Sequence, residues 1–304
     1  HPLATEAGAE ILRQGGNAFD AAAAVTAVLA VVEPYSSGLG GGGFYLLHRH
    51  QDNHQVMLDA REKAPLAASR DMYLDAQGKL TSDSMEGPLS AGIPGIPAAL
   101  AHLAANYGNL PLRETLKPAI RIAREGFAVN DHYRRMAKRR LSLLQRYPQS
   151  ARIFLQSNTV PERGHTIVQA DLAKTFEEIV KSDAKSFYSG KIARLMAAAV
   201  AADGGIWSED DLAQYAVIER EPIRGEYRGW RITSASPPSS GGIALVTMLN
   251  ILEPYALEAM DEAQRIHTIV EAMRHAYRDR ALFLGDADFV EVPVEELLSK
   301  QHAD

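Results

Sequence analysis

The chain has 304 residues, of which 46% are hydrophobic and 23% charged, and its formal net charge at pH 7 is -6. This composition is typical of a globular protein, and the negative charge gives no electrostatic support for general nucleic-acid binding. There is no cysteine, which excludes disulfide bonds, cysteine-ligated zinc and thiol catalysis. The longest apolar stretch, Ala21 to Val32, is too short to span a bilayer.

Two helices are predicted at the start of the chain. Residues 3–14 predict a helix that ends at Gly15-Gly16. Asn17 can cap a second helix, because its side-chain oxygen can accept from the first free backbone N–H groups. Residues 18–32 are apolar on nearly every side, which is typical of a helix buried in the middle of a domain.

A glycine-rich segment and a hairpin come next. Residues 38–43 contain five glycines, and residues 44–48 and 55–60 predict two antiparallel strands joined by a short turn. Arg61 lies directly after the second strand. The order is therefore helix, glycine loop and hairpin.

The rest of the chain predicts mainly helices, with another pair of strands near the end. A capping box is expected at Ser208 and Asp211, and a two-stranded segment at residues 222–234. Helices are expected at residues 96–107, 112–125, 130–146, 171–181, 186–203 and 263–284, and Pro237 to Gly242 lead into a further helix that runs through Leu252. This pattern predicts a single α+β domain over residues 1–304. Both ends lack terminating signals and look like cuts in a longer product.

The glycine loop has three interpretations. Phosphate binding is disfavoured, because phosphate-binding glycine turns follow a strand and open a helix, whereas here the helix comes first. A tight crossing of two backbones, where no side chain fits, is the structural alternative. The bare backbone could equally allow another segment or a substrate to approach closely.

Arg61 lies in a dense charge cluster, Asp59-Ala60-Arg61-Glu62-Lys63-Ala64-Pro65. An arginine held among acids at the rim of a sheet can bind a carboxylate through two parallel hydrogen bonds. A solvated surface arginine is the alternative, and the residues alone favour it.

Other clusters carry weaker hypotheses. His48, His50 and His54 could bind a metal or line an exposed strand face, and without cysteine or paired carboxylates the exposed face is favoured. The arginines and lysines of residues 130–146 are interpreted as a solvated helix surface. Ser239 and Ser240 lack the sequence of a nucleophile elbow, so Ser240 or a neighbour is expected to cap the following helix. No complete catalytic set is visible.

In order along the whole chain, many segments resemble the γ-glutamyltransferase (γ-glutamyltranspeptidase) family. They are His1-Pro2-Leu3-Ala4, Gly15-Gly16-Asn17-Ala18, Gly38-Leu39-Gly40-Gly41-Gly42-Gly43-Phe44, Asp59 to Pro65, Gly92-Ile93-Pro94-Gly95, Tyr107-Gly108, Arg124-Glu125-Gly126-Phe127, Gly204-Gly205, Asp210-Asp211-Leu212, Tyr227-Arg228-Gly229, Pro237 to Gly242, Asp279-Arg280 and Leu284-Gly285-Asp286. Each segment is weak evidence alone, but the ordered set is specific.

The resemblance implies the αββα four-layer sandwich of the N-terminal-nucleophile hydrolases, with this chain as the large-subunit part. In that family a precursor cuts itself before a threonine, which becomes the first residue of a small subunit. The threonine hydroxyl attacks the γ-carbonyl of glutathione or a related γ-glutamyl compound, and water or an amine resolves the γ-glutamyl-enzyme. No catalytic residue is then expected in this chain, and no metal or cofactor.

By the same resemblance, Arg61 binds the α-carboxylate of the γ-glutamyl group. The expected partners are the small subunit and a γ-glutamyl substrate such as glutathione, and the expected location is periplasmic or extracellular. The alternatives are a cephalosporin or glutaryl acylase, a poly-γ-glutamate-processing relative, and a non-catalytic binding protein of the same family.

Overall fold

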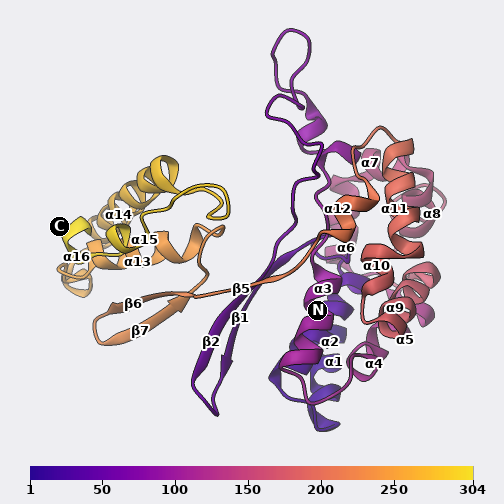
Figure 1. Ribbon diagram of the computed structural model, residues 1–304, viewed down its shortest axis with the longest axis horizontal. Coiled ribbons are helices and arrows are strands. Elements are labelled where there is room, and N and C mark those ends of the chain that lie inside the picture. The colour runs from indigo at the N-terminus through magenta and orange to yellow at the C-terminus, as the bar shows by residue number, and fades with distance from the viewer. Residues whose placement is uncertain (304) are drawn as a thin grey trace. The chain divides into compact units, whose positions relative to one another are not determined.

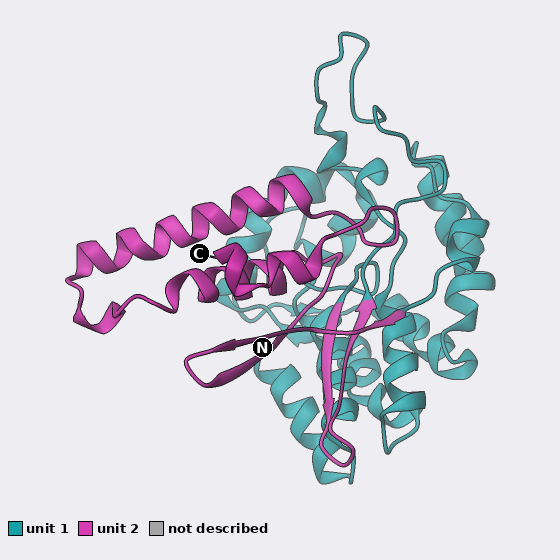
Figure 2. Ribbon diagram, turned by 60° about the vertical axis from the view of Figure 1, so that its left-hand side comes forward, with its two compact units in different colours: residues 1–43, 60–217 teal, residues 44–59, 218–304 magenta. Residues whose placement is uncertain are grey.

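The computed structural model describes residues 1–303, which form two compact units (Figures 1 and 2). Unit 1 consists of residues 1–43 and 60–217, and unit 2 consists of residues 44–59 together with the chain from 218 onward. A division into compact units does not decide whether they fold separately, so the single domain over residues 1–304 stays a prediction. In the described part of the chain, no helix is both long and apolar enough to cross a membrane.

Helix α2 (Ala18–Val32) lies at the centre of unit 1, as its sequence predicts. It packs against α1 (Pro2–Arg13), α3 (Ile96–Asn106) and α5 (Lys117–Glu125). The predicted cap is confirmed, because Asn17 Oδ1 accepts from the N–H groups of Phe19 and Asp20 at 2.9 and 3.0 Å. The Asp20 carboxylate accepts in return from the Asn17 N–H at 2.8 Å.

Three predicted helices of unit 1 are interrupted. The segment 112–125 divides into α4 (Leu112–Thr115) and α5, because Pro118 has no N–H for the continuing helix. A second break falls at Gly190, between α10 (Lys185–Ser189) and α11 (Lys191–Ala202). The third lies between α6 (Asp131–Arg139) and α7 (Leu141–Arg146). Unit 1 also contains α8 (Pro148–Phe154), α9 (Ala170–Ser182), α12 (Glu209–Ala213), the short strands β3 (Phe127–Ala128) and β4 (Thr166–Ile167), and the 3₁₀ turns η1 (Ser82–Ser84) and η2 (Pro88–Ser90).

Strands β1 (Gly43–Arg49) and β2 (His54–Ala60) form the predicted hairpin, and β2 continues directly into Arg61. A third strand, β5 (Ile218–Arg220), was not predicted and makes the sheet order β1-β2-β5. It pairs antiparallel with β2, so that Asp59 lies opposite Ile218 and Met57 opposite Arg220. This pairing joins segments about 160 residues apart, which local pattern does not reveal.

The remainder of unit 2 is a hairpin covered by helices. Strands β6 (Ile223–Tyr227) and β7 (Trp230–Ser234) pair antiparallel, as the sequence predicts. Helices α13 (Gly241–Leu252) and α14 (Glu262–Phe283) pack against each other and run side by side in Figures 1 and 2. The 3₁₀ turn η3 (Leu257–Ala259) connects them, and α15 (Val294–Leu297) and α16 (Lys300–Ala303) follow.

Candidate substrate-binding site

Arg61 is held in place through its backbone. It follows Ala60, which is fully buried at the end of β2. The Tyr215 hydroxyl donates to the Arg61 carbonyl at 2.9 Å. Two residues on, Lys63 and Ile93 exchange backbone hydrogen bonds of 3.2 and 2.8 Å. The backbone on both sides of Arg61 is therefore fixed, while its side chain is 52% exposed.

The glycine loop crosses this same backbone. A Cβ atom built on Gly42 would lie 2.4 Å from the Ala60 carbonyl oxygen and 2.6 Å from the Glu62 nitrogen. These distances are far inside van der Waals contact, and both atoms belong to backbone that cannot move away. The tight-crossing interpretation is therefore confirmed at Gly42. A Cβ on Gly40 or Gly43 would meet nothing within 4 Å.

Glu62 connects the loop to Arg61. Its Oε1 accepts from the Gly42 N–H at 2.8 Å, and its Oε2 lies 2.9 Å from Arg61 Nη1. Oε2 is buried, and within residues 1–303 no donor is aligned with it, so its contact with Arg61 is an ion pair rather than a well-directed hydrogen bond. One carboxylate therefore orients the loop and the guanidinium together. This role was not predicted from the sequence, although Glu62 lies within the charge cluster around Arg61.

The guanidinium borders a cavity of about 480 Å³ within unit 1. Its walls are mainly polar, with hydroxyl groups from helix α2 and from the segment that follows it. The lining residues are Thr26, Pro34, Tyr35, Ser36, Ser37, Gly38, Gly41, Gly42, Arg61, Glu62 and Ile96. Burial, with the Glu33 carboxylate nearby, raises the pKa of Tyr35 above its usual value, so this phenol stays neutral at pH 7.

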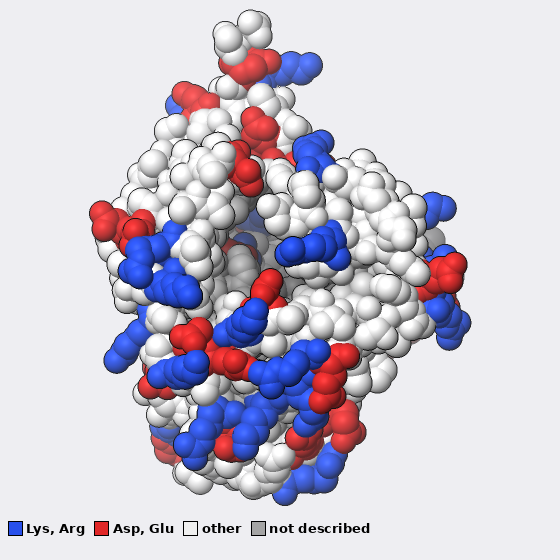
Figure 3. All heavy atoms as spheres, turned by 90° about the vertical axis from the view of Figure 1, so that its right-hand side faces the viewer, with Lys and Arg blue, Asp and Glu red and all other residues white. Residues whose placement is uncertain are grey.

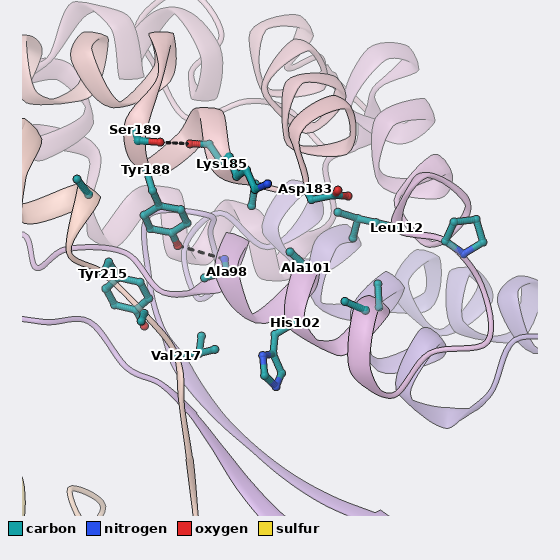
Figure 4. A pocket seen from close by; sticks show the side chains of 16 residues that line it. Ala98, Ala101, His102, Leu112, Asp183, Lys185, Tyr188, Ser189, Tyr215 and Val217 are labelled. Carbon is teal, nitrogen blue, oxygen red and sulfur yellow. Dashed lines mark hydrogen bonds between the residues drawn. The ribbon is translucent and has the colours of Figure 1, made fainter.

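A larger cavity of about 680 Å³ lies in unit 1, and alanines are the most frequent residues in its lining (Figure 4). Arg61 does not line it, but Tyr215 does. The Tyr215 ring stacks on Tyr188, with centroids 5.4 Å apart, and Tyr188 donates to the Pro94 carbonyl at 2.8 Å and accepts from the Ala98 N–H at 3.1 Å. Burial raises the pKa of Tyr188 well above its usual range. Tyr188 therefore supports the ring of Tyr215, whose hydroxyl donates to the Arg61 carbonyl.

The metal hypothesis receives no geometric support. The rings of His48 and His50 lie 6.5 Å apart, centroid to centroid, in an edge-to-face arrangement. Across the described residues, no group of three or more His, Cys, Asp or Glu side chains could hold a metal ion.

The structure also bears on the basic segment of residues 130–146 and on the capping role expected of Ser240 or a neighbour. On the face seen in Figure 3, Lys and Arg side chains are interspersed with Asp and Glu, as expected of a solvated surface. Arg140 and Arg146, from the basic segment, both lie near Glu86, at 3.8 and 3.5 Å. Ser240 does not cap α13; its Oγ accepts from Arg280 Nε at 3.0 Å, while Ser239 Oγ accepts from the Gly241 N–H at 3.2 Å.

Comparison with known proteins places the chain among close relatives. It is 42% identical over 304 residues to the glutathione hydrolase proenzyme of Escherichia coli, covering 99% of this chain and 52% of that protein. It is 37% identical to the acylase ACY 1 proenzyme of Pseudomonas sp. (strain V22), covering 100% of this chain and 56% of that protein. The chain thus spans about half the length of the curated relatives it matches.

The fold also matches that of a solved structure. The crystal structure of Helicobacter pylori γ-glutamyltranspeptidase superposes with a TM-score of 0.97 and 42% identity, covering 100% of this chain and 88% of that one. The predicted α+β fold of the N-terminal-nucleophile hydrolase type is thereby confirmed. A family model described as Gamma-glutamyltranspeptidase matches residues 4–304. The chain therefore belongs to the γ-glutamyltranspeptidase family.

Proposed function

We propose that this chain is the large-subunit part of an enzyme that cleaves γ-glutamyl amide bonds, as in glutathione. The enzyme transfers the γ-glutamyl group to water or to an amino-acid or peptide acceptor. The nucleophile is the N-terminal threonine of a small subunit cut from the same precursor. Membership of the family and the half-length match to proenzymes support this proposal.

The observation that carries the proposal is the Arg61 side chain at the edge of a polar cavity. Its guanidinium has the planar fork that binds a carboxylate through two hydrogen bonds. Its backbone is fixed by Tyr215, and its side chain is paired with Glu62 on one side. We propose that Arg61 binds the donor's α-carboxylate, which leaves the γ-carbonyl at the other end of the γ-glutamyl group for the nucleophile.

The chemistry follows from the proposed partner. The threonine hydroxyl adds to the γ-carbonyl, the amide C–N bond breaks, and the hydroxyl proton leaves with the amine through the threonine α-amino group. The γ-glutamyl ester is then cleaved by water or by an acceptor amine. The role of the present chain is to hold the donor so that its γ-carbonyl stays within reach of the nucleophile.

An acylase is the second candidate, because the chain is 37% identical to an acylase proenzyme over its full length. A glutaryl amide keeps the carboxylate of a γ-glutamyl amide but lacks its α-amino group, so the two activities differ in their need for that amine. Faster turnover of the glutaryl amide by the matured protein would favour the acylase. A periplasmic or extracellular location is also proposed, and fractionation of cells producing the full-length precursor tests it.

The proposal is tested by Arg61→Ala in the correctly cleaved protein. Truncating one partner of a charge pair costs about 2–5 kcal/mol, so kcat/KM for a γ-glutamyl anilide should fall by roughly one to four decades. Arg61→Lys should restore only part of the loss, because an ammonium keeps the charge but not the fork.

The matched control is a 4-aminobutyryl anilide, which keeps the amine and the scissile amide but has no α-carboxylate. Wild-type and Arg61→Ala proteins should turn over this poor substrate at similar rates. Equal losses on both anilides would assign Arg61 a structural role and remove the proposed carboxylate site.

A further inference from the structure

A second cavity, called the apolar cavity below, shares a wall with the polar cavity that Arg61 borders. Its volume is about 260 Å³, and both cavities lie within unit 1. Pro34 and Tyr35 line the two of them. Helices α6, α7 and α8 and the junction between α6 and α7 supply the rest of its lining. These residues are Tyr133, Met136, Ala137, Arg140, Leu143, Leu144 and Phe154.

Tyr35 forms much of the shared wall and is held there by aromatic contacts. Its ring meets those of His132 and Tyr133 edge to face, with centroids 5.2 and 5.9 Å apart. Tyr133 is fixed in turn, because its hydroxyl donates to the Phe154 carbonyl at 2.9 Å and its N–H donates to Asn130 Oδ1 at 2.8 Å. Burial raises the pKa of Tyr133 well above its usual value, so this phenol stays neutral. The wall is therefore preformed and uncharged.

The apolar cavity has the size of a side chain rather than of a whole ligand. Cavities that enclose drug-sized ligands measure about 300–1,000 Å³, and this one measures about 260 Å³. Its lining is aromatic and aliphatic apart from one arginine. Burying a side chain as large as that of leucine or phenylalanine in such a cavity favours binding by about tenfold or more.

Arg140 places one positive charge at the rim of the apolar cavity. Its side chain is 62% exposed, and its Nη1 lies 3.8 Å from Glu86 Oε1, which is too far for a hydrogen bond. Glu86 is also shared with Arg146, at 3.5 Å. The guanidinium of Arg140 therefore keeps donors for a carboxylate on a bound molecule. An apolar group with a carboxylate beside it matches both features of the cavity.

We infer that the apolar cavity binds the leaving amine and selects γ-glutamyl derivatives of large apolar amino acids, such as γ-glutamylphenylalanine. The inference rests on the proposed function and names its substrate class. With the donor's α-carboxylate at Arg61, the side chain beyond the scissile amide passes Tyr35 into the apolar cavity. The carboxylate of the same amino acid binds Arg140. The cysteine side chain of glutathione is smaller and fills less of this space.

Two donors test the inference in the matured protein. γ-Glutamylphenylalanine and γ-glutamylglycine carry the same γ-glutamyl group and the same second carboxylate, and they differ in the benzyl group. The parent should favour γ-glutamylphenylalanine in kcat/KM by about tenfold or more, mainly through a lower KM. Equal values for the two donors would overturn the inference.

Filling the apolar cavity should remove this preference. Ala137→Leu adds three carbons to the lining on α6 and should reduce the preference to about twofold or less, by raising KM for γ-glutamylphenylalanine. Ala105→Leu is the matched control, because Ala105 is an exposed alanine of α3 that lines the 680 Å³ cavity instead. It should keep the parent's preference. A matured Ala137→Leu protein that also keeps it would contradict the inference.

The contact with Arg140 is tested by Arg140→Gln. This change should lower kcat/KM for γ-glutamylphenylalanine by about tenfold. It should leave γ-glutamylphenylalanine amide within about twofold of the parent, because the amide has no carboxylate to present. Equal losses on the two donors would remove Arg140 from the site.

Titration calorimetry with free amino acids gives a reading that does not depend on catalysis or on any variant. Phenylalanine should bind the matured parent about tenfold or more tightly than glycine, and equal binding would overturn the inference. A protein that binds phenylalanine in this way but cleaves no γ-glutamyl donor would remove the proposed activity and keep the apolar site. Cleavage of both dipeptides with equal kcat/KM would keep the activity and remove the site.

Discussion

Arg61 in unit 1 and Arg220 in unit 2 both pair with carboxylates, but they do so in opposite ways. Arg220 is 15% exposed and is bound by two acids: Nε donates to Asp59 at 2.8 Å, and Nη1 and Nη2 donate to Asp288 at 2.8 and 2.7 Å. The hydrogen bonds that Arg220 donates to Asp288 and Asp59 raise its pKa, although burial opposes the shift. Arg61 is half exposed and borders a polar cavity.

The difference separates an arginine whose donors are occupied by the fold from one that borders a cavity and is proposed to bind a ligand. Two carboxylates already occupy the donors of Arg220, which leaves little capacity for a ligand. The Glu62 carboxylate lies against one end of the Arg61 guanidinium and fixes its direction. The charge pattern of the sequence does not distinguish Arg61 from Arg220, since each lies next to a glutamate.

The largest expected effect is that of Gly42→Val, because it disrupts the backbone crossing beside Arg61. Its Cβ would overlap the Ala60 carbonyl and the Glu62 nitrogen, so the loop cannot cross β2 as it does now. We expect no matured protein to accumulate. Gly40→Ala is the control, because a Cβ there meets nothing within 4 Å, and it should mature normally. Precursor and subunit bands on a gel provide the measurement, and a Gly42→Val protein that matures and melts like the parent would show the loop to be a spacer.

The second expected effect separates the two arginines directly. Arg220→Ala should lower the free energy of unfolding by about 3 kcal/mol or more, because it leaves the buried Asp59 without its guanidinium partner. Arg61→Ala should lower it by less than about 1 kcal/mol, since the Arg61 side chain is half exposed to solvent. Urea denaturation of the matured variants measures both. Similar losses in the free energy of unfolding for the two variants would contradict the distinction between Arg220 and Arg61.

The smallest expected effect concerns Asp211, which ties the segment after Arg61 to α12. Burial by itself would raise the pKa of Asp211, but hydrogen bonds from the Leu66 N–H and from Ser208 outweigh it and lower the pKa below the usual value. Because the folded pKa is lowered, this stabilisation is present above the ordinary Asp value of about 3.9 and is lost as the pH falls through the folded pKa.

Asp211→Asn should therefore cost about 1–2 kcal/mol at pH 7. The difference from the parent should shrink as the pH falls below about 4. Thermal unfolding of both proteins between pH 7 and pH 3 checks this. A difference that stays constant with pH would assign the loss to packing rather than to the carboxylate charge.

Much of the local structure around the site could be predicted from the sequence. The Asn17 cap, the buried helix α2 and the position of Arg61 directly after β2 all follow from patterns within a few residues. The crossing at Gly42 was one of the interpretations that the glycine run allowed. Its assignment required the structure, because the clash partners are Ala60 and Glu62.

The support of Arg61 could not be predicted, because it comes from far along the chain. The Tyr215 hydroxyl reaches the Arg61 carbonyl across 154 positions, and β5 pairs with β2 over a similar separation. Tyrosines and three-residue strands carry no local signal of such contacts. The interruptions at Pro118 and Gly190 were visible as residues that disfavour helix, but the hydrophobic periodicity on both sides concealed them.

The carbonyl of Gly41 affects the electrostatic field inside the polar cavity. It accepts from the N–H groups of Gly95 and Ile96 at 2.9 and 3.1 Å, at the start of helix α3. An open helix N-terminus carries a partial positive charge that can attract an anion, but here a carbonyl dipole already faces it. Among the described residues that line the cavity, the cationic one is Arg61. A negatively charged group entering the cavity therefore meets one formal positive charge, which is held beside the Glu62 carboxylate. Its orientation is set by a single guanidinium rather than by a diffuse dipole.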